Sequence, residues 1–173
     1  FSAFRNWRRR RAADRMQVSP AEWAAVERTL PFLAWLPPDD LPRLRRMALE
    51  FLADKEIHGA KGLVVTDAML LSIALQACLP VLHIGLDAYA GWIGIVVYPG
   101  DFVIPRSVAD EAGVVHEYDD EVLGEAWEGG PVLLSWFEGD DIPAGAAEGI
   151  NVVIHEFAHK LDMGNGDADG YPP

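Results

Sequence analysis

Three shortages limit what this chain can be. It has a single cysteine, Cys78, so no intrachain disulfide can form, which fits a reducing compartment such as the cytoplasm. Basic residues are also scarce, because 14 Lys and Arg stand against 27 Asp and Glu and the net charge is −13. A chain this acidic is poorly suited to bind nucleic acid directly, so we expect no nucleic-acid partner.

Long apolar runs are the third shortage. The stretch from Ala68 to Leu86 has no charged residue and is long enough to test as a membrane span. Pro80 and several polar residues interrupt it, however, and the hydrophobic pattern changes after Pro80. We therefore predict a buried helix to about Cys78, then a buried strand, and no membrane partner.

Several signatures of other enzymes are missing too. The chain has no GxSxG, no P-loop and no GxGxxG before a helix, which removes the sequence support for serine hydrolysis and nucleotide binding. Six arginines within the first 15 residues predict a basic N-terminal arm, residues 1–18, which we expect to be solvated, although an anionic partner is an alternative. Residues 19–173 are predicted to form one domain, incomplete at its C-terminal end.

Local signals outline the elements of that domain. Ser19, Pro20 and Glu22 form a capping box that starts a helix running to about Leu30, and Asp39-Asp40 starts another. Thr66-Asp67 caps the apolar helix. Alternating or continuous apolar residues between turn signals predict strands at Gly91–Ile104, Gly113–Tyr118 and Gly130–Phe137, with a shorter strand or hairpin between Glu56 and Val65.

The segment from Asn151 to Asp162 carries the pattern His-Glu-x-x-His, the signature of zinc hydrolases. Residues four apart on an α-helix lie on one face, so His155 and His159 can direct two imidazoles at one metal ion. Glu156 is rotated by about 100° from His155, so it can reach a water on the metal without being a ligand. The pattern predicts His155 and His159 as ligands of one zinc per chain and Glu156 as the catalytic base.

Asp162 follows on the same face as the two histidines. A carboxylate there can accept a ring N–H and fix the tautomer of a ligating histidine. The rest of the segment is apolar, and polar side chains in a buried helix need a compensating role because their desolvation costs free energy. The alternative is an amphipathic helix whose histidines are merely hydrogen-bonded.

A catalytic zinc site takes three protein ligands, so one ligand remains to be found. The metzincin pattern fails because Asp162 and Asn165 stand where it needs glycine and histidine. Asp167 and Asp169 come close behind the motif but lie in a glycine-rich stretch. Of the other histidines, His116 is the strongest candidate because it lies in a predicted strand beside acidic residues, although a lone strand histidine is more often structural.

Several stretches together resemble the Mlc titration factor A family. They cover nearly the whole chain: 53–57 (ADKEI), 66–69 (TDAM), 76–82 (QACLPVL), 94–99 (GIVVYP), 130–136 (GPVLLSW), 155–162 (HEFAHKLD) and 165–167 (NGD). The resemblance implies a cytoplasmic bacterial zinc metallopeptidase of aminopeptidase type that binds the glucose-regulon repressor Mlc. It also implies that His116 is the upstream strand histidine that completes the zinc ligands with His155 and His159.

The family's remaining ligand, a glutamate well downstream, has no counterpart in this chain. We therefore expect a truncated chain that binds zinc weakly and hydrolyses peptides poorly. The expected fold is α+β and zincin-like, with N-terminal helices and a mixed sheet against which the His155 helix packs. The strand at Val132–Phe137 can bind a peptide substrate if it forms the edge of that sheet. The alternative function is a non-catalytic regulatory protein that sequesters a transcriptional repressor.

Overall fold

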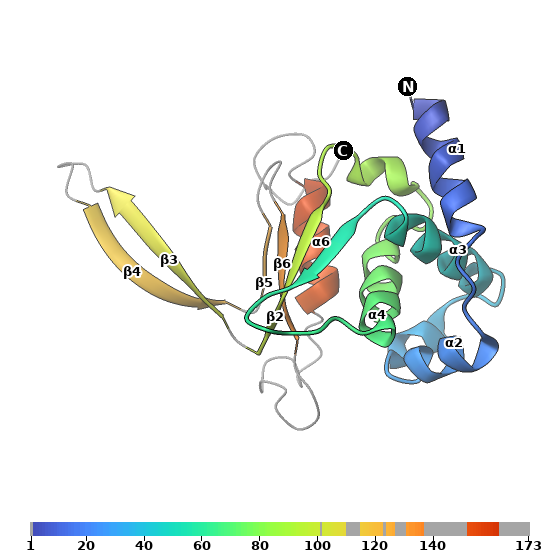
Figure 1. The fold of residues 1–173 in the computed structure, drawn as a ribbon, viewed down its shortest axis with the longest axis horizontal. Coiled ribbons are helices and arrows are strands. Elements are labelled where there is room, and N and C mark those ends of the chain that lie inside the picture. The colour runs from blue at the N-terminus through green and yellow to red at the C-terminus, as the bar shows by residue number, and fades with distance from the viewer. Residues whose placement is uncertain are drawn as a thin grey trace.

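The computed structural model describes most of the chain, and the elements below lie within that part (Figure 1). The described residues are 2–100, 102–109, 115–122, 124–126, 131–136 and 152–162. Within these ranges, residues 2, 102–126, 152 and 155 are described by their backbone alone.

Helices form the N-terminal third. The capping box is confirmed: the Ser19 hydroxyl accepts the Glu22 N–H at 3.2 Å, and the Glu22 carboxylate accepts the Ser19 N–H at 2.7 Å. This box starts α2, Pro20–Glu27, which ends earlier than predicted and gives way to the 3-10 helix η1, Pro31–Trp35. The next helix, α3, spans Asp40–Leu52 and buries one stripe of its surface in the core.

The basic N-terminal arm contains a helix, α1, Ser2–Ala13, and most of its described residues are exposed. Ala13 and Arg9 are buried, and Arg46 of α3 binds both the Asp14 carboxylate at 2.6 Å and the Arg10 carbonyl at 3.3 Å. A run of arginines has low hydrophobicity, so composition gives no sign of packing here. Contacts with α3 supply the packing that composition cannot show. The division into residues 1–18 and 19–173 stays a prediction.

The apolar helix is confirmed as α4, Asp67–Cys78, and the Thr66 hydroxyl caps it by accepting the Met69 N–H at 3.2 Å. The strand predicted after Pro80 is wrong. Residues 79–90 form turns and the 3-10 helix η2, Leu86–Tyr89, whose Leu86 and Tyr89 side chains are buried. A short apolar run fits either structure, and Gly85, with φ of +95°, interrupts the extended conformation. No helix in the described part of the chain is long and apolar enough to cross a bilayer.

A four-stranded mixed sheet lies beside the helices, in the order β1-β2-β6-β5. The strand β1, Glu56–Gly59, pairs in parallel with β2, Gly94–Pro99, which pairs in parallel with β6, Val132–Trp136. The short strand β5, Gly124–Ala126, runs antiparallel to β6. Because β2 and β5 flank β6 on its two sides, the condition for peptide pairing at Val132–Phe137, a position at the sheet edge, is not met.

Two further strands form a separate hairpin. The strand β3, Phe102–Ala109, pairs antiparallel with β4, Val115–Val122, and His116 lies opposite Val108. Figure 1 shows this hairpin projecting from the sheet on the side away from the helices.

The predicted His155 helix is confirmed as α6, Val152–Asp162. It lies beside β5 and β6 on the helical side of the sheet, next to α4 (Figure 1). Its Phe157 and Leu161 side chains join the same hydrophobic core as Leu44, Ile73 and Val97 from α3, α4 and β2. The expected α+β, zincin-like fold with the His-Glu-x-x-His helix against a mixed sheet is confirmed.

Candidate active site

The helix α6 presents two different faces. Glu156, Phe157, Lys160 and Leu161 are buried and follow the spacing of one helical stripe. His159 is half-buried and Ala158 is exposed, so the adjacent face is open to solvent. His159 therefore lies at the border between core and solvent.

The backbone places the two histidines on one face of α6. His155 and His159 both lie within the continuous helix α6, so their Cα–Cβ bonds point from one face, one turn apart. The His155 side chain lies outside what the structure describes. Two imidazoles four residues apart on a rigid helix are a donor set that suits zinc, which favours nitrogen ligands.

Glu156 is held differently from the histidines. Its side chain is only 6 % exposed, although it lies between His155 and His159 in sequence. Burying a carboxylate costs free energy, and an isolated carboxylate on a surface helix would simply turn to water. Glutamate is one of the side-chain types that general acid–base catalysis uses. Asp162, 6 % exposed at the end of α6, is also withdrawn from solvent.

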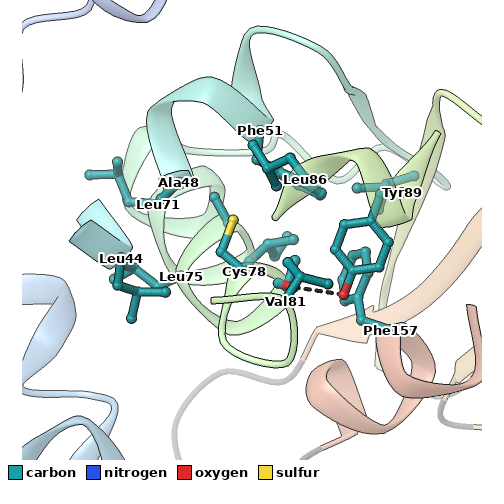
Figure 2. Packing of buried hydrophobic residues seen from close by; sticks show 14 of the residues in the cluster. Leu44, Ala48, Phe51, Leu71, Leu75, Cys78, Val81, Leu86, Tyr89 and Phe157 are labelled. Atoms are coloured by element: carbon teal, nitrogen blue, oxygen red, sulfur yellow. Dashed lines mark hydrogen bonds between the residues drawn. The ribbon is translucent and has the colours of Figure 1, made fainter. Parts of the chain in front are cut away.

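Four aromatic rings fix the position of α6. Phe157, which is fully buried, lies 5.7 Å from the Phe51 ring, 5.6 Å from Tyr89 and 6.0 Å from Trp92 between ring centroids. Figure 2 shows Phe157 beside Tyr89, whose hydroxyl donates a hydrogen bond to the Ala77 carbonyl at 2.7 Å. Contacts between offset or edge-on rings add to the free energy of burial. The motif helix is therefore anchored one residue after Glu156.

Two lysines meet the same cluster at Trp92. The Lys55 ammonium lies 4.1 Å from the Trp92 ring centroid and donates to the carbonyls of Tyr89 at 2.7 Å and Trp92 at 2.6 Å. Lys160 of α6 lies 5.3 Å from the same centroid. Burial lowers the pKa of both lysines, and the positive charge of Lys55 lowers the pKa of Lys160 further. Trp92 thus links the α3–β1 junction to the motif helix.

The His-Glu-x-x-His motif gives no sign that Lys55 packs beneath the motif helix. Lys55 stands between Asp54 and Glu56 in a polar stretch, where a surface position is the ordinary expectation. Its burial follows from the carbonyls of the 89–92 segment, which lie far along the chain. The one available signal was the 53–57 stretch, which carries the family resemblance but no role for the lysine.

The three histidines outside α6 are His58, His83 and His116. His58 and His83 are exposed, and each faces a carboxylate, Glu56 at 3.5 Å and Asp40 at 3.6 Å. His116 belongs to β4 of the projecting hairpin. Its side chain lies outside the description, as do Asp167 and Asp169 in residues 163–173. The third ligand therefore stays a prediction.

No group of three or more His, Cys, Asp or Glu side chains able to hold a metal occurs among the residues with described placement. That set excludes the side chains of His155 and His116. The site that the motif predicts would use the side chains of both histidines. Its fit to zinc therefore rests on the four-residue spacing of His155 and His159 on α6, which suits two zinc ligands.

Comparison with known proteins assigns a family. The family model described as glucose-regulated metallo-peptidase M90 matches residues 4–173. A protein of Cronobacter sakazakii named Mlc titration factor A is 36 % identical over 156 residues, which cover 90 % of this chain and 58 % of the relative. The protein of the same name from Klebsiella pneumoniae strain 342 is 39 % identical over 144 residues, covering 83 % of this chain and 54 % of the relative. The chain thus spans little more than half the length of these relatives.

Proposed function

Because this chain belongs to the glucose-regulated metallo-peptidase family M90, we propose that it carries the reaction centre of a zinc-dependent peptidase of aminopeptidase type. The observation that supports this most is the burial of Glu156 on the helix that also bears His155 and His159. A surface helix with the same three residue types would leave the carboxylate in water. Here the core holds it next to the histidine face.

Each residue has a chemical task in this proposal. His155 and His159 would hold the ion through ring nitrogens, with His116 as the candidate third ligand, and Asp162 would accept a ring N–H. Zinc, when bound, supplies a Lewis acid that lowers the pKa of water and polarises the scissile carbonyl. The Glu156 carboxylate accepts a proton from the attacking water and then donates it to the nitrogen of the leaving amine. The aromatic anchor at Phe157 keeps Glu156 in place between these transfers.

The test separates metal binding from proton transfer. Replacing Glu156 by Gln keeps size and burial but removes the base, so we expect hydrolysis of aminoacyl nitroanilides to fall by roughly 10²- to 10⁴-fold with zinc content unchanged. Changing both His155 and His159 to Ala should abolish the zinc measured by mass spectrometry. Glu56→Gln, at an exposed strand position, is the matched control and should leave both readouts unchanged.

The aminopeptidase assignment has its own control. N-acetylated versions of the same nitroanilides remove the free amine, so an aminopeptidase should lose them as substrates. Equal turnover of free and acetylated substrates would identify an endopeptidase instead. Stoichiometric zinc that survives the double histidine change would contradict the metal site itself.

A second proposed function is binding of the repressor Mlc in the cytoplasm, which the names of the relatives suggest. In the alternative of a purely regulatory protein, the peptidase fold serves only as a binding shape. Glu156→Gln distinguishes the two, because it should stop hydrolysis and leave retention of purified Mlc on immobilised protein unchanged. If the wild-type protein holds Mlc but hydrolyses no substrate even with zinc supplied, the regulatory alternative is supported.

A further inference from the structure

The structure contains a groove that takes no part in the proposed reaction. It measures about 900 Å³ and lies between α1 and a wall formed by Ala53, Asp54 and Ile93. Figure 1 shows α1 at the edge of the molecule, far from the β3–β4 hairpin. Asp54 and Ile93 are sequence neighbours of Lys55 and Trp92, so the groove lies against the support of α6 rather than on the histidine face.

The charge of the groove opposes that of the rest of the chain. Residues 1–15 contain six arginines and Asp14, a charge of +5, so the remaining residues carry −13 − 5 = −18. Five of those arginines line the groove, while Asp54 is its one acidic lining residue and lies 3.4 Å from the Lys55 ammonium. The lining arginines are Arg5, Arg8, Arg9, Arg11 and Arg15.

These arginines differ in how far they are already engaged. Arg5 and Arg9 contact the Asp87 carboxylate at 3.4 and 3.3 Å, which fixes α1 to η2. Arg8 and Arg15 are exposed and form no ion pair with any residue that the structure describes. The groove therefore presents Arg8 and Arg15 to an anion, beside Arg5 and Arg9, which hold its wall in place. The fifth arginine, Arg11, lies over the Trp7 ring.

Apolar surface accompanies the charge. Phe4, Trp7 and Ile93 line the groove and are 63 %, 52 % and 58 % exposed. The Phe4 and Trp7 rings stack at 5.9 Å on the α1 side, and Ile93 stands on the opposite wall. Large apolar side chains gathered in a concave, charged site are typical of a surface that binds a partner.

We propose that the groove beside α1 binds an acidic protein segment with apolar side chains. The carboxylates of the segment pair with Arg8 and Arg15, because guanidinium groups bind carboxylates through two parallel N–H donors. Its apolar side chains cover Trp7 and Ile93. Two partners that carry phosphate fit less well. A flat anionic bilayer does not fill a groove, and a long nucleic acid would also approach the remaining chain, which carries a charge of −18 and repels it.

The experiment measures binding of a labelled Glu-Glu-Leu repeat peptide by fluorescence anisotropy, with both peptide ends blocked against hydrolysis. We expect the double variant Arg8→Ala/Arg15→Ala to weaken binding by at least about fivefold, and more salt to weaken the wild-type complex. Arg10→Ala is the matched control, because Arg10 is exposed on the same helix but does not line the groove, and it should change affinity less than about twofold.

A second variant tests the apolar wall without changing any charge. Ile93→Ser should weaken the leucine peptide but not a Glu-Glu-Ser repeat, and circular dichroism of each variant should match the wild type. The proposal is overturned if the double arginine variant binds the peptide as tightly as the wild type, or if Arg10→Ala loses as much. Binding to phosphatidylserine vesicles without binding to the peptide would overturn it in favour of a membrane surface.

Discussion

Among the described tryptophans that carry a cation over the indole ring, Trp92 lies in the core and Trp7 lies at the surface. Trp92 is 7 % exposed and has Lys55 at 4.1 Å and Lys160 at 5.3 Å from its ring centroid. Trp7 on α1 is 52 % exposed and has Arg11 at 5.3 Å. The contact is of one kind, but the surroundings differ.

The difference shows how burial changes the consequences of one contact. A cation over an exposed ring contributes about 0.5–1 kcal/mol, and about 2 kcal/mol or more when water is removed from it. At Trp92 the lysine also satisfies two backbone carbonyls, so its loss would leave acceptors without donors. At Trp7 water can replace the arginine. The buried contact therefore supports the segment that packs against α6, whereas the exposed contact adds little to the stability of α1.

The largest expected effect comes from Lys55→Met. Methionine keeps much of the apolar stem but removes the ammonium, so the carbonyls of Tyr89 and Trp92 lose donors at 2.7 and 2.6 Å. Because buried unsatisfied acceptors cost about 1–3 kcal/mol each, and relief from burying a charge offsets part of this, we expect the free energy of unfolding to fall by about 2–4 kcal/mol. Urea titration measures it.

Lys61→Met is the matched control for that change. Lys61 is exposed, and its ammonium lies 5.9 Å from the Tyr98 ring centroid. We expect less than about 0.5 kcal/mol here, because the side chain is exposed and replacing lysine by methionine leaves a non-glycine residue at the positive φ of 49° in both proteins. If Lys55→Met and Lys61→Met lower the free energy of unfolding equally, the burial of Lys55 beside Trp92 adds no stability beyond that of an exposed lysine.

Local sequence signals predicted the elements that local chemistry forms. The capping box at Ser19, the Thr66 cap and the apolar periodicity of α4 and α6 each depend on residues within a few positions, and the structure confirms them. The His-Glu-x-x-His spacing likewise predicted a helix with one histidine face. These predictions succeed because helix caps and helix faces are decided within one or two turns.

Other features depended on partners distant in sequence. The position of β6 in the strand order could not be predicted from its own residues, because a buried apolar run suits any interior strand. The strands that flank it come from residues 94–99 and 124–126. The burial of Lys55 needs carbonyls more than thirty residues away. The docking of α1 needs Arg46 and Asp87. Sequence periodicity carries no information about such pairs.

Tyr89→Phe, in the buried aromatic cluster, is expected to lower the free energy of unfolding by less than Lys55→Met does. This change removes the hydroxyl that donates to the Ala77 carbonyl at 2.7 Å, so we expect a loss of about 1 kcal/mol at neutral pH. Burial raises the pKa of the Tyr89 hydroxyl above its ordinary value of 10.0. The native state thus keeps the hydroxyl protonated where the unfolded chain ionises it.

The raised pKa of Tyr89 predicts how the stability difference between the two proteins depends on pH. The stability contributed by protonated Tyr89 is fully present below pH 10.0 and is lost as pH rises through the higher native pKa. The gap between wild type and Tyr89→Phe should therefore narrow above about pH 10, measured by urea titration in matched buffers. Cys78, whose pKa burial also raises, is present in both proteins and largely cancels in the difference. A gap that stays constant would mean that the Tyr89 hydroxyl is open to water in solution.

The smallest expected effect is that of Arg11→Ala on the surface tryptophan. The guanidinium lies 5.3 Å from the Trp7 centroid, but both side chains are exposed, and alanine favours the helix at least as much as arginine. We expect the free energy of unfolding to change by less than about 0.5 kcal/mol, while the Trp7 contribution to the summed emission of the six tryptophans shifts because Arg11 no longer lies over its ring. Urea titration followed by circular dichroism gives the first quantity, and fluorescence compared with that of Arg10→Ala gives the second. A loss above about 1 kcal/mol would mean that the Trp7 pair holds α1 in place much as Lys55 holds the segment around Trp92, and burial would then not explain the difference between the two tryptophans.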